Sequence, residues 1–490
     1  MHGRTHSSLI PLARAGLVAA CIGHAAACGG GEPDKTVEVP TVNDGGMDAT
    51  ADSDTGAADG GSDGATNRAD AAQHSDSGST GDAGLTSDGG PNGADSGLTT
   101  DAGPDAGFPA GDPTESCSLA IEHAELEQGV DISDEEGFAV ALGITGFGVA
   151  FQADDCGAIG SLPVAATGAY LMPHLMFDDC SAIVRSVSLV HVDGGFRMAW
   201  VDNRSGSSEL QTLLLSEAMG APDPTMPTRV TTNQRRERRA AQWKLGSAHF
   251  LTWISSDPDG RNAQIEQLST DTADEPHVLV AADSGYNPTR IALAQLGKQQ
   301  GVLAFVSESS KPGAWLLPLD TAGTPVGSPT VLSPFVTTGN AIDVTTREVD
   351  GGAVIYSIDV GDNGHEVRFR RLDSQGAFLT DDIKLVPTPL QARDAGIARL
   401  GDGYVVGFRS LPTNGEARGE IRMMFITKEG NVQRDSFGGL ISYPVADASP
   451  DGGRVSVRVS TDGQLLITFL DTAASGTKLR LVRKRLDCTL

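Results

Sequence analysis

The chain after residue 117 repeats one pattern: a glycine, a short apolar run, and a large aromatic residue that ends the run. The pattern occurs seven times, and successive aromatic residues lie 49, 53, 52, 51, 52 and 61 positions apart, or 53 on average. The pairs are Gly148 and Phe151, Gly195 and Trp200, Gly246 and Trp253, Gly301 and Phe305, Gly352 and Tyr356, Gly403 and Phe408, and Gly463 and Phe469. A fixed period of this length is typical of a chain built from repeated structural units.

Each unit contains the signals of three more short strands. A polar loop such as residues 202–206 follows the aromatic residue and leads to a segment of alternating apolar and polar positions, as in 366–372. A turn with glycine comes next, then a short strand such as 276–280, and then a strand such as 290–294 that leads to the next glycine. Four short strands per unit predict a propeller blade. The sequence therefore predicts an all-β, seven-bladed β-propeller of about 53 residues per blade over residues 117–490.

The two ends of the repeat region complement each other. The last unit stops at Leu490 after its third strand and so lacks an outer strand. The first unit has a spare apolar segment, residues 117–121, before its own inner strand at 138–142. We therefore predict that the N-terminal strand completes the last blade and closes the ring.

Four cysteines belong to the predicted propeller. Closure of the ring would place Cys117 beside Cys488, and we predict a disulfide between them. Cys156 and Cys180 remain, both in the first unit, and pair by elimination. Two disulfides are expected rather than metal ligands because no Cys-x-x-Cys spacing occurs in this exported chain.

Residues 29–116 have a composition that cannot form a hydrophobic core. They contain 18 acidic and two basic residues, for a net charge of −16, and Phe108 is their only aromatic residue. Like-charge repulsion and a high glycine content favour an extended coil. We therefore expect a disordered tether over residues 28–116. The 374 residues of 117–490 carry a further net charge of −14.

Residues 1–27 have the pattern of an export signal. Arg4 and Arg14 precede an apolar segment that is too short to span a bilayer and ends at a cysteine. This pattern resembles the signal peptide of bacterial lipoproteins, in which a lipidated cysteine becomes the mature N-terminus. Cys28 is the preferred lipidation site, Cys21 is the alternative, and a plain secretory signal also fits. The resemblance implies export and lipid anchoring to the outer membrane, with the cell surface as an open alternative.

The second unit carries a family resemblance. Trp200, Asp202, Arg204 and Gly206 are similar to the Trp-x-Asp-x-Arg-x-Gly repeats of secreted bacterial propellers and, more loosely, to TolB-like propellers. The other units keep this motif only in part. The acidic tether after a Cys-Gly-Gly-Gly start also resembles lipoproteins of myxobacteria. These resemblances imply a propeller-bearing lipoprotein and no specific activity.

One face of the predicted ring is rich in carboxylates, because the loops between second and third strands meet there. The candidate binding residues on this face are Asp154, Asp155, Asp202, Arg204, Asp257, Asp259, Glu308, Asp359, Asp362 and Asp471. A ring of carboxylates could hold a cation or a basic partner. Ordinary turn chemistry is the alternative, because β-turns favour Asp. We assign no metal site and no cofactor, with Ca²⁺ as the alternative.

One basic cluster, residues 234–239, contrasts with the acidic balance. Its place between the second and third units predicts a solvated loop between blades, and docking of an anionic polymer is the alternative. The net charge of −28 argues against nucleic acid as a partner, because phosphate binding needs clustered basic side chains.

The sequence contains no recognisable catalytic motif. His-Glu-x-x-His and Gly-x-Ser-x-Gly are absent, and residues 357–361 match only the first half of the Asp box of sialidases. We therefore assign no catalytic residues and expect a monomeric envelope lipoprotein whose propeller binds a protein or glycan partner. The alternative is a secreted hydrolase or lyase that acts on polysaccharide or peptide.

Overall fold

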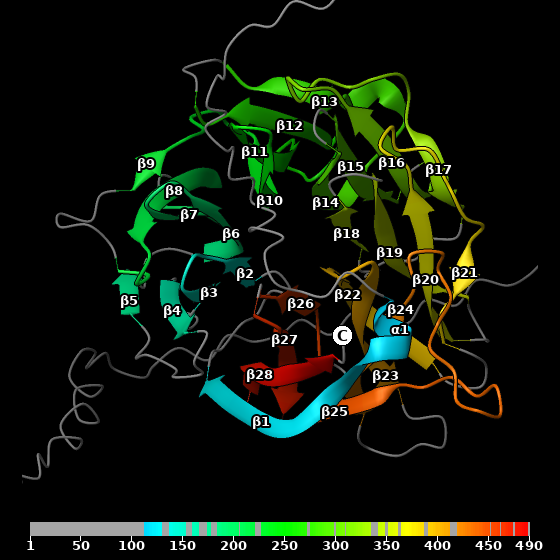
Figure 1. Cartoon of the computed structure of the whole chain (residues 1–490). Helices are drawn as coiled ribbons and strands as arrows, with labels where there is room; N and C mark the ends of the chain where they lie inside the picture. The colour runs from blue at the N-terminus through cyan, green and yellow to red at the C-terminus, as the bar shows by residue number, and fades with distance from the viewer. Residues whose placement is uncertain are drawn as a thin grey trace, which may run out of the picture. The chain divides into compact units, whose positions relative to one another are not determined.

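The computed structural model describes residues 112–129, 137–152, 159–165, 174–177, 184–204, 206–220, 227–271, 275–297, 300–308, 310–334, 342–347, 351–360, 364–386, 391–411, 419–450, 452–460, 462–473 and 476–488. In these ranges the strands form seven four-stranded antiparallel sheets around a common centre (Figure 1). The predicted all-β, seven-bladed propeller is confirmed. The signal peptide, the two lipidation candidates, the tether before residue 112, and Cys156 and Cys180 lie outside the described residues.

The first four blades follow one another along the chain. Blade 1 comprises β2 (Phe138–Leu142), β3 (Gly146–Gln152), β4 (Ile159–Ala165) and β5 (His174–Phe177). Blade 2 comprises β6 (Val184–Val192), β7 (Gly195–Asp202), β8 (Glu209–Ser216) and β9 (Thr228–Arg229). Blade 3 comprises β10 (Arg236–Leu245), β11 (Ala248–Ser256), β12 (Gln264–Ser269) and β13 (His277–Val280). Blade 4 comprises β14 (Pro288–Leu296), β15 (Gln300–Ser307), β16 (Gly313–Leu319) and β17 (Thr330–Ser333), with the 3-10 helix η1 (Ala282–Ser284) before it.

The last three blades complete the ring. Blade 5 comprises β18 (Ile342–Arg347), β19 (Gly351–Asp359), β20 (His365–Leu372) and β21 (Ile383–Lys384). Blade 6 comprises β22 (Gln391–Leu400), β23 (Gly403–Leu411), β24 (Gly419–Ile426) and β25 (Tyr443–Ala448). Blade 7 comprises β26 (Val455–Val459), β27 (Gln464–Ala473), β28 (Gly476–Cys488) and, from the other end of the chain, β1 (Cys117–Gly129). The first strand of each blade lies innermost and contacts the first strands of both neighbouring blades.

The repeated aromatic residue lies on the second strand of every blade, and none of the seven is more than 2% exposed. Trp200, for example, packs in a cluster that joins blade 2 to Ala139 and Ala150 of blade 1. Apolar second strands therefore bind neighbouring blades together. The glycine at the start of the strand has a steric reason, because a Cβ on Gly195 would lie 2.0 Å from the carbonyl oxygen of Leu215 on the paired strand.

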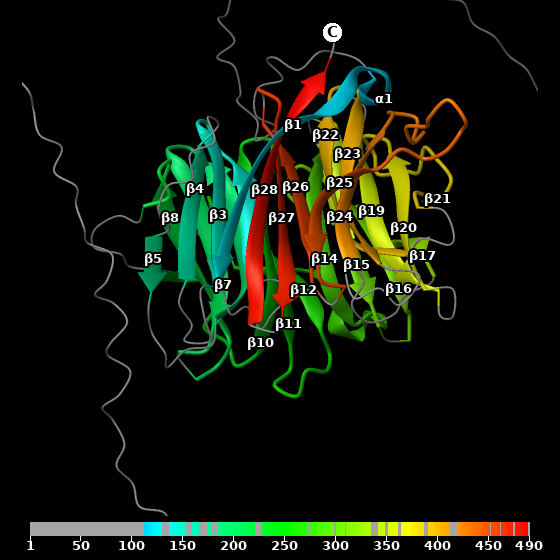
Figure 2. The same ribbon diagram turned by 90° about the horizontal axis from the view of Figure 1, so that it is seen from below.

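The ring closes as the sequence predicts, with β1 paired antiparallel to β28 (Figure 2). Cys117 and Cys488 are directly opposed, their Cα atoms are 4.0 Å apart, and they form a disulfide. The closing strand is longer than the expected residues 117–121, since it continues to Gly129 along a third strand of equal length. Extended pairing and one covalent bond therefore join the two ends of the domain.

The described part of the chain begins before residue 117, within the stretch that the sequence assigns to the tether. Helix α1 (Pro113–Ser116) precedes β1, and Asp112 caps it by accepting a hydrogen bond from the Thr114 amide. Gln433 of blade 6 donates to the Thr114 carbonyl oxygen at 2.8 Å. A cap and a tertiary contact thus order these residues despite their polar composition. In the described part of the chain, no helix is long and apolar enough to cross a membrane.

Candidate functional site

Asp202, a carboxylate of the predicted loop face, binds groups of its own blade. Asp202 ends β7 and its side chain is buried. It accepts a hydrogen bond from the Trp200 indole at 3.0 Å and pairs with the Arg204 guanidinium. The structure therefore brings together Asp202 and Arg204, two members of the candidate set, but as partners of each other. This pair fixes the turn after β7 and the position of the blade tryptophan.

Three other carboxylates of this face also bind groups of the protein. Asp257 accepts from Arg235 at 3.1 Å and from the Asn262 amide at 2.6 Å. Asp259 is exposed and accepts from the backbone amide of Arg261 in the same turn. Asp471 accepts from the Ser449 amide and from Arg480. These contacts agree with turn chemistry, the alternative explanation of the acidic residues.

The remaining members of the set do not add to a shared site in the described structure. Asp359 is the last residue of β19 and is half-buried, and Glu308 is exposed after β15. Asp154, Asp155 and Asp362 lie outside the described residues. Within the described ranges, no group of three or more His, Cys, Asp or Glu side chains could hold a metal ion.

Two buried glutamates, Glu209 of blade 2 and Glu237 of blade 3, differ in their surroundings. Glu209 is fully buried and accepts hydrogen bonds from Ser207, Thr231 and Arg229. Glu237 is 2% exposed, and burial raises its pKa to about 8, with the nearby charge of Glu266 adding to the rise. Glu237 is therefore protonated at neutral pH, whereas Glu209 has a cationic partner.

The basic cluster at residues 234–239 is not a solvated loop, and this prediction is wrong. The innermost strand of blade 3, β10, begins at Arg236. Arg235 donates to Ser255 and Asp257, and Arg238 donates to the Pro288 carbonyl oxygen of blade 4. Arg239 lines the centre of the ring. This charged segment forms a strand because it is the innermost strand of blade 3 and contacts the innermost strands of blades 2 and 4.

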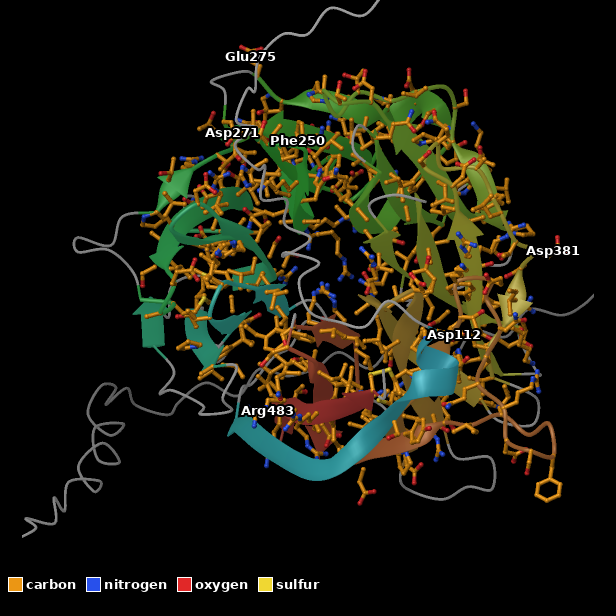
Figure 3. The ribbon with its side chains drawn as sticks, viewed as in Figure 1. Asp112, Phe250, Asp271, Glu275, Asp381 and Arg483 are labelled. Carbon is orange, nitrogen blue, oxygen red and sulfur yellow. A yellow bond between two sulfur atoms is a disulfide. The ribbon has the colours of Figure 1, made fainter. Side chains whose placement is uncertain are left out.

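The centre of the ring contains a cavity of about 160 Å³. Its lining comes from the first strands of all seven blades and from Arg454, which immediately precedes β26. The charged lining residues are Arg239, Arg290, Arg454, Arg458, Asp343 and Asp394. Four guanidinium groups against two carboxylates make the lining basic in a protein of net charge −28. Figure 3 shows nitrogen-bearing side chains around the middle of the ring, whereas Glu275 and Asp381 lie at its outer rim.

We call this cavity the central channel. Its two carboxylates, Asp343 and Asp394, bind donor groups of the protein itself. Asp343 accepts from the Ile397 amide of the next blade at 3.1 Å and from the Val344 amide. Asp394 pairs with the fully buried Arg409 at 3.2 Å and with Arg393. Burial lowers the pKa of Arg409, while the charge of Asp394 opposes this change. Protein hydrogen bonds thus take up much of the acceptor capacity of these carboxylates.

Three of the innermost strands have unusual backbone geometry in or beside the cavity lining. Ser186, Arg239 and Asp394 have φ values of +54°, +57° and +54°, and each lies within a β-bulge of its innermost strand. This left-handed conformation costs a non-glycine residue roughly 1–2 kcal/mol. The Arg239 amide donates to the Ser186 hydroxyl of the neighbouring blade at 2.9 Å. Strained bulges that re-aim side chains are common beside functional sites.

The four arginines of the central channel are not among the site residues predicted from the sequence. Two of them, Arg290 and Arg454, nevertheless stand at one fixed position of the repeat. An arginine stands 15 positions before the blade aromatic in five units, at Arg185, Arg238, Arg290, Arg393 and Arg454. Three of these arginines donate to a carbonyl oxygen of the next blade or of the segment leading to it: Arg238 to Pro288, Arg393 to Pro450 and Arg454 to Phe138. The period thus marks a link between blades, and only Arg290 and Arg454 of this set also line the cavity.

The solved structures that resemble this chain do so at low sequence identity. No protein-family model and no curated protein sequence matches the chain. Among solved structures, it resembles an ancestral GH74 enzyme with a TM-score of 0.48, 11% identity, and coverage of 75% of this chain and 51% of that one. TolB from Acinetobacter baumannii matches with a TM-score of 0.34 and 12% identity, over 75% of this chain and 82% of that one. An exo-1,5-alpha-L-arabinanase from a bovine ruminal metagenomic library matches with a TM-score of 0.33 and 14% identity, over 61% of this chain and 92% of that one.

Proposed function

We propose that this chain is an exported, lipid-anchored protein of the cell envelope whose propeller binds a protein or glycan partner. The N-terminal signal pattern and the acidic tether support the anchoring. The central cavity supports the binding role and is the observation that carries it, because residues from all seven blades converge there. The cavity replaces the acidic loop face as our candidate site, because Asp202, Asp257 and Asp471 have partners within the fold.

Binding is favoured over the alternative of a hydrolase or lyase. General acid–base hydrolysis of a glycan uses a pair of carboxyl groups that face the bound substrate. The carboxylates of the described cavity lining, Asp343 and Asp394, accept hydrogen bonds from backbone amides and from arginines. Four arginines in the same lining suit the recognition of a ligand rather than the activation of water.

A cross-linked pull-down from envelope fractions tests the binding role. The full-length protein is compared with the double variant Arg239→Gln/Arg290→Gln, and Arg261→Gln is the control because its side chain is 83% exposed. We expect a defined partner with the wild type and the control, and a loss of that partner with the channel variant. Recovery of no specific partner, together with turnover of a polysaccharide or peptide, would instead support the hydrolase.

Metabolic labelling with a fatty acid tests the anchor separately. We expect the label on the wild type and on Cys21→Ser, and its loss from Cys28→Ser. Loss from Cys21→Ser alone would move the lipid to the other cysteine. A wild type without label would show a plain secretory signal, and mass spectrometry of the mature N-terminus then gives the cleavage site.

A further inference from the structure

The four arginines of the central channel lie on two opposite sides of the ring, and its two carboxylates, Asp343 and Asp394, come from blades 5 and 6. Arg239 and Arg290 come from blades 3 and 4, and Arg454 and Arg458 come from blade 7. In a seven-bladed ring, blade 7 stands across the centre from blades 3 and 4, as the positions of β10, β14 and β26 in Figure 1 show. A small ligand in the channel therefore has guanidinium groups on both sides.

Backbone carbonyl oxygens hold the two arginines on the blade 7 side, Arg454 and Arg458. Arg458 donates to the carbonyl oxygens of Val140 and Val457, at 3.3 and 2.7 Å. Arg454 donates to the Phe138 carbonyl oxygen and lies over the Phe138 ring. A backbone carbonyl oxygen is a neutral acceptor, so these bonds orient the two guanidinium groups. The bonds to blade 1 thus position positive charge at the channel.

The opposite side is positioned by the backbone. Arg239 lies in a bulge with positive φ, and its amide is held by Ser186 of blade 2. Gln242, three residues further along the same strand, is also held, since its backbone amide donates to the Ser188 hydroxyl. The side chain of Arg239 therefore starts from a fixed point. Preorganised donors lose little conformational freedom when they bind.

The size and chemistry of the cavity select the ligand. A volume of about 160 Å³ holds a small molecule or one end group of a larger one. Guanidinium groups bind carboxylates and phosphates with paired, charge-assisted hydrogen bonds. We propose that the channel holds an oxyanionic group, a carboxylate or a phosphate, between Arg239 and Arg290 on one side and Arg454 and Arg458 on the other. This proposal rests on the proposed binding function and names the ligand class of that site.

Calorimetric titration of the full-length protein with three probes tests the ligand class. Inorganic phosphate and glucuronate carry the oxyanion, and glucose is the neutral match of glucuronate. We expect one or both anions to bind at constant ionic strength and glucose not to bind. Preference between phosphate and glucuronate tells which oxyanion the channel accepts. Equal binding of glucose and glucuronate, or binding of neither anion, would overturn the proposal.

Matched variants connect the binding to the channel. Arg239→Gln/Arg290→Gln should weaken the anion affinity at least tenfold, and Arg261→Gln should leave it unchanged. Arg458→Lys keeps the positive charge and should bind within a few-fold of the wild type, whereas Arg458→Gln should not. Thermal unfolding of each variant verifies the fold. An equal loss in Arg261→Gln would attribute the binding to overall charge and refute the channel site.

The two proposals can fail separately. Anion binding that depends on the channel arginines, without any envelope partner in the pull-down, would support the oxyanion site and refute the binding-module function as stated. An envelope partner captured equally well by the wild type and by Arg239→Gln/Arg290→Gln would refute the channel as its site while the function stands.

Discussion

The loop face and the central channel both concentrate charge, but their partners lie at different distances along the chain. On the loop face, Asp202 pairs with Arg204 and Asp259 binds the amide of Arg261, two positions away in each case. In the channel, Arg239 and Arg458 are brought to one cavity from strands more than two hundred residues apart. Local partners stabilise turns, whereas residues that are distant in the sequence converge on the lining of one cavity.

The largest effect is expected when the disulfide that closes the ring is removed. Cys117→Ser/Cys488→Ser removes a cross-link over a sequence separation of 371, and the loop-entropy model assigns it about 6 kcal/mol of stability. We expect the free energy of unfolding to fall by up to that amount and the anion affinity to weaken, because the channel needs all seven blades. Denaturant unfolding and calorimetry measure the two effects. Unchanged stability in the double variant would show that pairing of β1 with β28 closes the ring without help from the disulfide.

The buried glutamate behind the loop face gives a pH test. The pKa of Glu237 rises from its ordinary 4.5 to about 8, mainly through burial. As the pH rises from about 4.5 to 8, the unfolded chain loses this proton first, so the free energy of unfolding falls over that window and levels off above it. The total change is on the order of 5 kcal/mol.

Glu237→Gln should remove this pH dependence and stabilise the protein at pH 8. Unfolding curves at several pH values measure the effect, and Glu429→Gln, at an exposed turn position, is the control. A variant that retains the wild-type loss of stability between pH 5 and pH 8 would show that another group binds the proton.

The buried arginine beside the channel links the two regions. Arg409 is fully buried, pairs with Asp394, and donates to the carbonyl oxygens of Ser449, Gly453 and Leu470. Arg409→Leu leaves these groups without their partner and should cost about 3 kcal/mol in unfolding free energy. It should also weaken anion binding, because the Asp394 carboxylate then faces the channel with one cation fewer. Normal anion affinity in a destabilised variant would separate Asp394 from the ligand site.

The smallest effect is expected on the loop face itself. Asp202→Ala removes the acceptor of the Trp200 indole and of Arg204, which should cost about 2 kcal/mol. Asp259→Ala, at an exposed turn, should cost no more than about 0.5 kcal/mol. Neither variant should change anion affinity in calorimetry. A tenfold loss of ligand binding in either variant would return the site to the loop face.

Much of the fold could be predicted because it repeats. The blade aromatics recur at a nearly constant spacing, and the incomplete last unit indicates which strand closes the ring. The disulfide between Cys117 and Cys488 follows from that closure. The prediction failed at residues 234–239 because an arginine-rich segment lacks the apolar alternation that marks a strand. Helix α1 likewise has no hydrophobic signal in the sequence, because a side-chain cap and a tertiary contact hold it.

The sequence by itself determined the number of blades, the buried aromatic position of each, and the pair of strands that closes the ring. These features depend on local patterns and on their period, which are present in the order of residues. Only the tertiary structure decided which charges are available to a ligand. Asp202 turns inward to its own blade, while Arg239, Arg290, Arg454 and Arg458 meet at the centre because seven innermost strands surround one cavity. The local field at a site depends on which side chains converge there, and net charge along the chain does not contain that information.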